Sequence, residues 1–405
     1  MQILAGNFNP EILWDTRNHH ELVGYIKNQG SSVMNNKYEK ITTEILEMAG
    51  IQINGNNPWD IRVHNKEFYR RAITEGELGL GEAYMDGWWD ADNVDELIDR
   101  ILKTKLDEII KRKFSILFKL FMARLFNLQS QSRAFIIGEK HYDLGNDLFQ
   151  NMLDKRMNYS CAYWKDAVTL DEAQENKLEL ICRKLYLKPG MRVLDIGCGW
   201  GPFGKYAAAR YKVNVTGITV SKEQVELGRK LCEGVSVDFR LTDYRNINEK
   251  FDRIVSIGMV EHVGYKNYKS FFEVANRCLK DDGLFLLHTI GDLKSSKTIN
   301  PWTHKYIFPN AVIPSVAQLG RGFEKYFVME DWHNFGADYD KTLMVWHDNF
   351  VKNWDKIKSH KSDRFYKMWN YYLLSAAASF RSRRSQLWQI VLSKKGIPGG
   401  YQSVR

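Results

Sequence analysis

Cysteine is scarce and irregularly placed in this sequence. The five cysteines, an odd number, stand at positions 161, 182, 198, 232 and 278, and none belongs to a C-x-x-C pair. A scattered set of this kind argues against a disulfide framework and against a zinc site, and it favours a reducing cytosol. We therefore expect a cytoplasmic protein that has no structural metal.

Long apolar segments are also missing. The first ten residues lack the basic stretch followed by an apolar one that marks a secretory signal. No run of 18 apolar residues exists, and the nearest candidate, 114–126, is interrupted by Lys119 and Arg124. We therefore expect no membrane-spanning helix, so any contact with a membrane is made from its surface.

The charge balance favours an anionic partner. Lys and Arg number 58 against 49 for Asp and Glu, which leaves a net charge of +9 at neutral pH. Such a surplus is typical of proteins that meet nucleic acid or an anionic membrane surface. With 405 residues, of which 44% are hydrophobic, the chain is long and apolar enough for two globular domains.

The N-terminal region, 1–128, predicts a smaller, mainly helical domain that meets membrane lipid. Residues 1–37 are polar and rich in Asn, and we expect a poorly ordered start there. A helix is predicted over 38–49. The aromatic segment GLGEAYMDGWWD at 79–90 suits a small core and an interface equally well.

A second helical pattern covers 94–126. Its apolar residues, such as Phe114 and Leu117, share one face, with basic residues such as Lys111 and Arg124 among them. A basic amphipathic helix suits an anionic lipid surface, but a buried helix with solvated lysines fits the same pattern. A linker is expected at 129–135.

From residue 136 onward, strand-like and helix-like segments alternate, as in a doubly wound parallel sheet. The predicted fold class is α/β, with a Rossmann-like domain over 136–405. Strands are predicted at 191–197, 214–220, 251–258, 283–290 and 325–332, and a last strand, 387–393, is expected to pair antiparallel at the edge. The aromatic connection 292–323 is long, and a substrate cover is expected there, at the carboxyl end of the sheet.

Three alternate glycines follow the first of these strands, in the segment VLDIGCGWG at 193–201. Glycine permits a tight turn and lets backbone amides approach a ligand. A dinucleotide site needs G-x-G-x-x-G and an acidic residue about 20 positions on, but Pro202 takes the sixth position and no acid ends the next strand. Asp195 followed by G-x-G-x-G instead resembles the first motif of S-adenosylmethionine (SAM) methyltransferases, so SAM is the predicted cofactor.

Polar and ionisable residues gather where the predicted strands end. Glu261 and His262 follow the strand 251–258, and His288 closes the strand 283–290. The segments 158–164 and 336–343 carry further residues of this kind. A single His or Glu is more often structural, but several at the catalytic edge of one sheet favour an active site.

Many of these segments occur together, and in the same order, in one known family. They are GLGEAYMDGWW, KHYDLGNDLF, YSCAYWKD, LDIGCGWG, MVEHVG, LLHTIG, ADYDKTLM and QLWQIV. Over about 38–394 the chain resembles the bacterial cyclopropane-fatty-acyl-phospholipid synthases, and it is similar to the mycolic acid cyclopropane synthases. The resemblance implies a SAM-dependent methyltransferase domain.

The resemblance also implies a reaction. SAM would give its methyl group to the cis double bond of an unsaturated acyl chain in a membrane phospholipid, and a base would then remove a proton from that methyl group so that a cyclopropane ring closes. In the family the base is a bound bicarbonate ion, at positions that match Cys161, Glu261, His288, Ile290 and Tyr339 here. Glu261, which as a carboxylate only accepts hydrogen bonds, would take the bicarbonate hydroxyl. His288, Tyr339 and the backbone amides near the other two positions would donate to the remaining oxygens.

The cofactor contacts carry over in the same way. The matching positions are Tyr159, Ser160, Asp195, Gly197, Cys198, Gly199, Thr219, Gln224, Asp243 and Tyr244. The first two residues and the glycine turn would hold the methionine part, Thr219 and Gln224 the methionine and ribose, and 243–244 the adenine. Family members often have another glycine where Pro202 stands, which the first turn of a helix tolerates. Some have a cysteine at Ala376, so no thiol chemistry is assigned to that position.

Two alternatives stay open. A SAM-dependent lipid C-methyltransferase that closes no ring would share this site, and its product has the same mass. A basic, SAM-sensing protein that binds nucleic acid would explain the charge, but the sequence carries no recognisable nucleic-acid module. We expect an enzyme peripheral to the inner face of the cell membrane, which binds unsaturated phospholipids and an anionic surface and not nucleic acid. The resemblance implies a homodimer.

Overall fold

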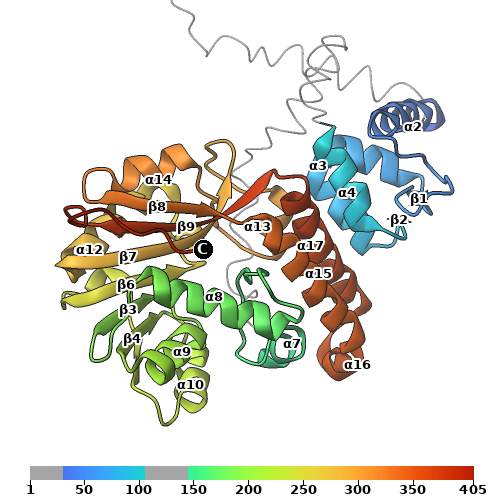
Figure 1. The fold of residues 1–405 in the computed structure, drawn as a ribbon. Helices are drawn as coiled ribbons and strands as arrows, with labels where there is room; N and C mark the ends of the chain where they lie inside the picture. The colour runs from blue at the N-terminus through green and yellow to red at the C-terminus, as the bar shows by residue number, and fades with distance from the viewer. Residues whose placement is uncertain (1–30, 105–144) are drawn as a thin grey trace, which may run out of the picture.

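The computed structural model describes residues 31–104 and 145–405 of the chain. They form a helical N-terminal part and a larger α/β part built on one sheet (Figure 1). This architecture confirms the predicted fold class. The basic segment between residues 111 and 124 and the predicted linker 129–135 lie outside the described residues.

Seven strands of the described chain form the central sheet, in the order β5-β4-β3-β6-β7-β9-β8. Their bounds are β3 Arg192–Ile196, β4 Asn214–Thr219, β5 Val237–Leu241, β6 Phe251–Ile257, β7 Leu279–Asp292, β8 Val328–Asn334 and β9 Ser385–Ser393. The strands from β5 to β7 run parallel, and β9 pairs antiparallel with both β7 and β8. The carboxyl ends of the parallel strands therefore meet at one edge of the sheet.

The sheet differs from the sequence prediction at two strands. No sequence pattern marks β5, because it buries only Phe239 between the polar residues Asp238 and Arg240. β9 is antiparallel as expected, but it lies between β7 and β8 and not at the edge itself. Burial explains this order, since β9 is covered along nearly all of its length while the edge strand β8 is largely exposed.

Helices cover both faces of the sheet. α8 and α9 cover one face, where Leu178, Phe203 and Leu286 are buried together. α12 and α14 cover the other face, where Phe272 and Leu319 are buried. The bounds on this part of the chain are α8 Leu170–Lys184, α9 Pro202–Tyr211, α10 Lys222–Leu231, α11 Val260–Val263, α12 Tyr268–Cys278 and α14 Val316–Phe323.

Local signals set the starts of these helices. Thr169 and Glu172 form a capping box at α8, in which each side chain accepts from the other residue's backbone N–H. α9 begins at Pro202 directly after Gly201, whose backbone is left-handed, so the proline is accommodated at the first helical turn. α14 lies within the predicted insert 292–323 but packs on α12, so only the part before α14 extends away from the sheet.

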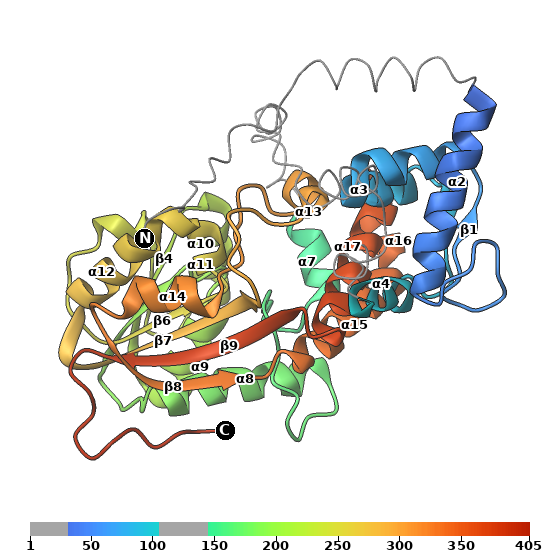
Figure 2. The ribbon, with the colours of Figure 1, turned by 90° about the horizontal axis from the view of Figure 1, so that it is seen from above.

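A helical hairpin joins the sheet to the N-terminal part. It consists of α15 Ala337–Lys352, α16 Trp354–Ile357 and α17 Asp363–Arg381, and it connects β8 to β9. The short helix α7, Asn146–Met152, packs against α15. Figure 2 shows α3 and α4 beside this hairpin, on the side away from the sheet.

The N-terminal part is built around aromatic side chains. Its elements are α2 Ser31–Met48, β1 Arg62–Val63, α3 Glu67–Met85, β2 Trp89–Asp90 and α4 Val94–Lys103. α2 begins earlier than the helix predicted from residue 38. Trp89 is completely buried, with its ring 5.0 Å from Tyr84 and 6.4 Å from Tyr371 of α17. The aromatic segment at 79–90 is therefore at once a small core and a contact with the hairpin.

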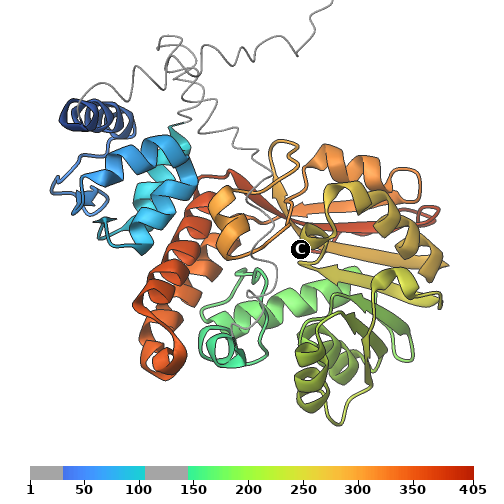
Figure 3. The same cartoon turned by 180° about the vertical axis from the view of Figure 1, so that it is seen from behind.

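The insert after β7 reaches the N-terminal part as well (Figure 3). Its helix α13, Pro301–Tyr306, packs on α3, and Trp302 is buried with its ring 4.8 Å from Tyr371. A Cβ on Gly81 would lie 2.5 Å from the Trp302 ring, so α3 has a glycine where the indole packs. None of the helices within 31–104 and 145–405 combines the length and apolar character that a bilayer-spanning segment requires.

Candidate active site

The glycine turn after β3 forms an open cradle at the carboxyl edge of the sheet. Gly197 has a φ of +81°, and a Cβ on it would lie 2.6 Å from Cγ of Met259, so the position requires glycine. A Cβ on Gly199 would meet no atom of the described chain within 4 Å. The turn, with Cys198 at its centre, therefore borders open space at the start of α9.

Asp195 of β3 carries a buried carboxylate with an unused atom. The residue is 2% exposed, and Oδ1 has no hydrogen-bond partner among the residues that the structure describes. Burial raises the pKa of Asp195 to about 7, and the charge of nearby Lys177 opposes the rise. A buried carboxylate oxygen is normally paired, so a ligand N–H or O–H in the cradle would satisfy it.

Lys177 of α8 is buried beneath the same region. Its Nζ donates to Oδ1 of Asn158 and to Oγ of Ser160, both at 2.9 Å. Burial lowers the pKa of Lys177 to about 8, while Asp154 opposes the change. The Ser160 hydroxyl thus accepts from Lys177 and keeps its own proton to donate, and the contact holds the segment 158–161 against α8.

The other predicted cofactor residues lie at the ends of β4 and β5. The Thr219 hydroxyl donates to Oε1 of Gln224 at 2.7 Å, so these two residues are brought together next to the glycine turn. Asp243 instead accepts hydrogen bonds from the backbone and the guanidinium of Arg245, at 2.9 and 2.8 Å. Tyr244 packs against α12. The Asp243 carboxylate is therefore hydrogen-bonded within its own turn.

Glu261 follows β6 on α11 and reaches the end of β7. Its Oε1 accepts a hydrogen bond from the backbone N–H of Ile290 at 2.7 Å. Its Oε2 is buried and has no partner anywhere in the described ranges. Burial raises the pKa of Glu261, and backbone hydrogen bonds, including that from Ile290, together with the nearby Thr289 hydroxyl oppose the rise. That hydroxyl donates to the carbonyl of Ile290 at 2.9 Å. The Ile290 amide is thus bound to Glu261, which differs from its expected role as a donor to an anion, and Oε2 is the atom left for a ligand.

His288 of β7 is buried on the face of the sheet that α8 covers. Its Nδ1 lies 3.3 Å from Nε2 of Gln389 on β9, and its own Nε2 has no partner within the described part of the chain. Burial, together with the charges of Lys177 and Lys184, lowers the pKa of His288 well below its usual value. His288 is therefore a neutral imidazole with one ring nitrogen available.

Cys161 and Tyr339 belong to the same buried cluster. The Cys161 thiol donates to the carbonyl of Ala162 at 3.1 Å, and burial raises its pKa well above the usual range, so it is not a nucleophile. Tyr339 of α15 is also buried, and burial, followed by Tyr372, Cys161 and Glu261, raises the pKa of its phenol. Cys161 and Tyr339 lie in one buried hydrophobic cluster, and Glu261 is near enough to influence the pKa of Tyr339.

Aromatic rings surround this cluster. The hydroxyls of Tyr159 and Tyr372 lie 3.0 Å apart, and the Tyr159 ring lies 5.4 Å from that of Trp346. Phe308 of the insert comes within 5.9 Å of Tyr372 and 5.6 Å of His262. Sequence reasoning does not find Tyr372 and Trp346, because aromatic residues at helical spacing are the signal of any buried helix. Such rings suit an apolar chain and a developing positive charge.

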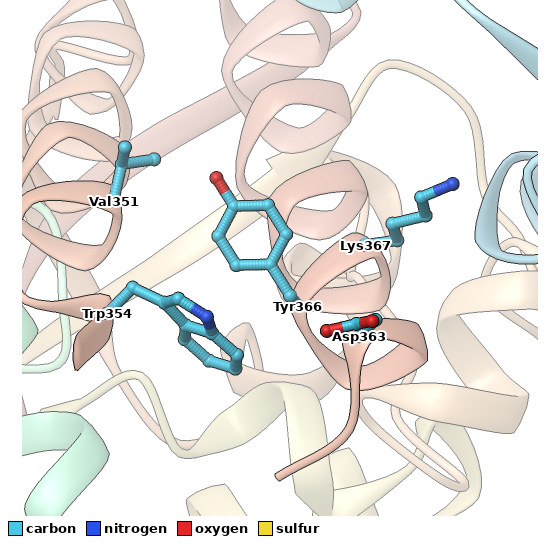
Figure 4. A pocket seen from close by; sticks show the side chains of 5 residues that line it. All are labelled: Val351, Trp354, Asp363, Tyr366 and Lys367. Atoms are coloured by element: carbon cyan, nitrogen blue, oxygen red, sulfur yellow. The ribbon is translucent and has the colours of Figure 1, made fainter. Parts of the chain in front are cut away.

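A hollow of about 360 Å³ lies elsewhere, at the far end of the hairpin. Its walls are Val351, Trp354, Asp363, Tyr366 and Lys367 (Figure 4). None of these five is a candidate site residue.

Comparisons with known proteins show which family the chain is similar to. The family model described as mycolic acid cyclopropane synthetase matches residues 129–390. The cyclopropane-fatty-acyl-phospholipid synthase of Escherichia coli (strain K12) is 53% identical over 374 residues, which cover 92% of this chain and 98% of that protein. A probable fatty acid methyltransferase of Pseudomonas putida is 34% identical over 64% of this chain and 69% of its own length. Among solved structures, the mycolic acid cyclopropane synthase CmaA1 complexed with SAH and CTAB has a TM-score of 0.59 and 34% identity, over 63% of this chain and 96% of that one.

Proposed function

This chain belongs to the mycolic acid cyclopropane synthetase family, and from that premise we propose that it transfers a methylene group from SAM to the cis double bond of acyl chains in membrane phospholipids. The product is a cyclopropane ring. One observation supports the chemistry most directly: the buried Oε2 of Glu261 and Nε2 of His288 both lack partners among the described residues, at the sheet edge that carries the glycine cradle.

The residues at the cradle fit SAM. Gly199 borders open space, Oδ1 of Asp195 needs a donor, and Thr219 with Gln224 adds hydroxyl and amide groups beside the turn. When bound there, SAM supplies an electrophilic methyl group. The chain itself would orient that group and keep water away from it, since Cys161 and Tyr339 are buried.

We propose that a bicarbonate ion serves as the base. Ionised Glu261 has an oxygen that only accepts, so it suits the hydroxyl of such an ion, whereas a ring N–H of His288 suits one of its charged oxygens. A halide ion has no hydroxyl group, so it could not donate a hydrogen bond to Glu261. The positive charge of buried Lys177, close enough to His288 to lower its pKa, favours an anion in this region.

The aromatic surroundings fit the acyl substrate. Tyr159, Tyr372 and Phe308 present rings close to the cluster, which favours an acyl chain over a polar substrate. When the alkene takes up a methyl group, positive charge develops on the neighbouring carbon, and aromatic faces stabilise such a charge.

The test is turnover on lipid. Purified full-length chain is incubated with SAM and vesicles of a monounsaturated phospholipid, and the extracted lipid is examined by proton NMR. We expect the high-field signals of a cyclopropane ring, and none with vesicles of a saturated phospholipid. Absence of turnover on every unsaturated lipid offered would contradict the proposal.

A second candidate function is methyl transfer to lipid without ring closure. The similarity to the Pseudomonas putida protein supports it, at lower identity and over less of the chain than the similarity to the Escherichia coli protein. Both products add the same mass to the lipid, so mass alone does not separate them. Methyl-branch signals in place of cyclopropane signals would establish this alternative.

We further propose that the enzyme acts as a peripheral homodimer on the inner face of the membrane. The net charge of +9 supports an anionic surface, and each basic residue near it contributes about 1 kcal/mol, screened within about 10 Å at 0.1 M salt. Co-sedimentation should therefore need anionic lipid and weaken with salt. Light scattering should give twice the 47.4 kDa chain mass. Replacing Lys111, Arg112 and Lys113 together should loosen vesicle binding without lowering SAM affinity.

A further inference from the structure

Gln389 belongs to the segment QLWQIV, and the proposed reaction leaves it without a role. It lies on β9 directly opposite His288 of β7 on one side and His333 of β8 on the other. Paired residues on neighbouring strands point to the same face of a sheet. The three side chains therefore form a row across β7, β9 and β8.

The row ends at Lys184 of α8. This side chain is completely buried, and its Nζ lies 3.0 Å from Nδ1 of His333 and 3.8 Å from Oδ2 of Asp331. Burial lowers the pKa of Lys184 to about 7, while Asp331 opposes the change. The ammonium form of Lys184 can only donate hydrogen bonds, so His333 accepts from that form through Nδ1.

The other end of the row shows the same pattern. Nε2 of Gln389 lies 3.3 Å from Nδ1 of His288, in surroundings that are buried. The amide nitrogen of Gln389 faces Nδ1 and is a donor, so His288 likewise accepts through Nδ1. Oε1 of the same amide is buried without a partner among the described residues. The one ring nitrogen of His288 without a partner in the described residues is then Nε2.

We propose that Gln389 is a positioning residue: by donating to Nδ1, it selects the tautomer of His288 that carries its proton on Nε2 and presents this N–H to the active-site anion. The identity of that anion rests on the proposed function. The tautomer itself does not.

The charges around His288 support this assignment. The titratable groups around it are Lys177 and Lys184 of α8, His333 of β8, and Glu261 of α11, which is bound to the same strand at Ile290. Burial and the two lysines lower the pKa of His288, so its ring carries a single proton. In such a ring the hydrogen bond at one nitrogen decides where the proton sits.

The first test reads the tautomer directly. The full-length protein is labelled with ¹⁵N-histidine, the His288 signals are assigned with a His288→Gln variant, and spectra are recorded from about pH 6 to 8. We expect a protonated Nε2 and an unprotonated Nδ1 throughout. A proton on Nδ1, or a doubly protonated ring, would overturn the proposal.

The second test reverses the polarity of the contact. In Gln389→Glu the carboxylate replaces a donor by an acceptor, so it should draw the proton to Nδ1 and raise the pKa of His288. Below this raised pKa both ring nitrogens are protonated and Nε2 still donates, but above it Nε2 loses its hydrogen. Turnover should therefore fall about tenfold or more as pH rises, while the SAM dissociation constant at each pH stays equal to that of the parent. A pH profile identical to that of the parent would refute the role of Gln389.

Gln389→Met keeps the proposal testable if the carboxylate prevents folding. It has a similar size and no hydrogen-bonding group, so the His288 spectrum should show both tautomers, with turnover about tenfold lower. The control is Gln386→Met on the same strand, whose side chain pairs with Asn334 at 2.7 Å. It should leave the His288 spectrum unchanged. If Gln386→Met changed the His288 spectrum as much as Gln389→Met does, the change would reflect the general packing of β9 and not the hydrogen bond from Gln389.

The outcomes separate the two proposals. If His288 carries its proton on Nε2 but turnover ignores bicarbonate, the proposed base is wrong and the role of Gln389 stands. If turnover needs bicarbonate but the proton sits on Nδ1, the role of Gln389 is wrong and the base stands.

Discussion

The buried carboxylate of Glu82 on α3 accepts a hydrogen bond from the Tyr306 hydroxyl of α13 at 2.7 Å. Lys305 of the same helix pairs with it as well. Further along this insert, the backbone N–H of Val312 donates to the carbonyl of Glu261 at 2.8 Å. The insert is therefore fixed at one end to the N-terminal part and at the other to the helix that carries Glu261.

Replacing Glu82 by Ala should destabilise the fold. The change leaves Arg71, whose side chain is 13% exposed, with its more exposed partners Asp86 and Glu75. Breaking a buried pair costs about 3–5 kcal/mol in free energy of unfolding, and the remaining partners place the expected loss at the lower end of this range. Urea denaturation followed by tryptophan fluorescence measures the loss. The control is Glu75→Ala: it removes an exposed carboxylate 3.5 Å from the same arginine and should cost about 1 kcal/mol or less. Equal losses would show that the insert contact adds nothing.

The contribution of Glu82 to the free energy of unfolding should also depend on pH. Burial tends to raise its pKa, but hydrogen bonds from Lys305, Tyr306 and Arg71 outweigh this and hold the pKa of Glu82 below its usual value. A carboxylate with a lowered pKa in the folded state contributes stability above its unfolded pKa, near 4.3, and loses it as pH falls through the folded value. The difference in free energy of unfolding between the parent and Glu82→Gln should thus be largest near pH 7 and shrink below about pH 4. A constant difference would contradict the ionic contact.

Much of the site follows from local sequence. The glycine turn with Asp195 is contiguous, and Glu261 and His288 directly follow or close strands that apolar runs reveal. Parallel strands bring their carboxyl ends together, so the sequence alone predicts that the residues at these ends lie at one edge.

Other features depend on contacts that sequence patterns do not encode. The position of β9 between β7 and β8, and hence the row through Gln389, follows from pairing between segments far apart in the chain. Lys177 looks like a solvated helix residue, yet it is buried against Asn158 and Ser160. The hydrogen bond from Ile290 to Glu261 likewise depends on tertiary approach: the sequence predicts donor amides near Ile290, and the amide of Ile290 itself donates to Glu261.

SAM affinity should rise with pH through neutrality. Asp195 has a pKa of about 7, and only its ionised form accepts hydrogen bonds with both oxygens, so a ligand that donates to Oδ1 selects that form. The dissociation constant should fall about tenfold between pH 6 and 8, as measured by calorimetry. Asp195→Asn should bind SAM more weakly and without this slope. Asp238→Asn, an exposed change on β5, should keep it. A slope that survives in Asp195→Asn would assign the titration to another group, such as Lys177.

Glu261→Gln should abolish most turnover and leave SAM binding intact. Glutamine keeps an oxygen for the Ile290 N–H but places an NH₂ group where Oε2 stands, so an acceptor becomes a donor. We expect turnover about 10²–10³-fold lower, with the SAM dissociation constant unchanged. Glu273→Gln removes an exposed carboxylate from α12 and should behave as the parent does. Near-normal turnover in Glu261→Gln would exclude Glu261 from the proton-transfer step.

The last prediction concerns the base itself. The proton to be lost sits on a carbon next to a cationic centre and is therefore strongly acidic, so a weak base is sufficient. Among the side chains of the buried cluster, Cys161 and Tyr339 are held neutral by burial. Glu261 binds Ile290 through Oε1, and its Oε2 is the atom proposed to hold the ion. Removing carbon dioxide and bicarbonate from the protein and the buffer should accordingly lower turnover, and added bicarbonate should restore it.

A tightly held ion could mask this requirement in the parent enzyme. Tyr339→Phe removes one proposed donor to the ion while keeping the ring that packs 4.6 Å from Phe380, so the fold should survive. Losing one hydrogen bond to a charged group costs about 1.5–3 kcal/mol, which corresponds to roughly 10–100-fold weaker retention of bicarbonate. The variant should show a saturable bicarbonate requirement at concentrations where the parent is already saturated. If both proteins turned over at the same rate with and without bicarbonate after verified depletion, Glu261 itself would have to be the base.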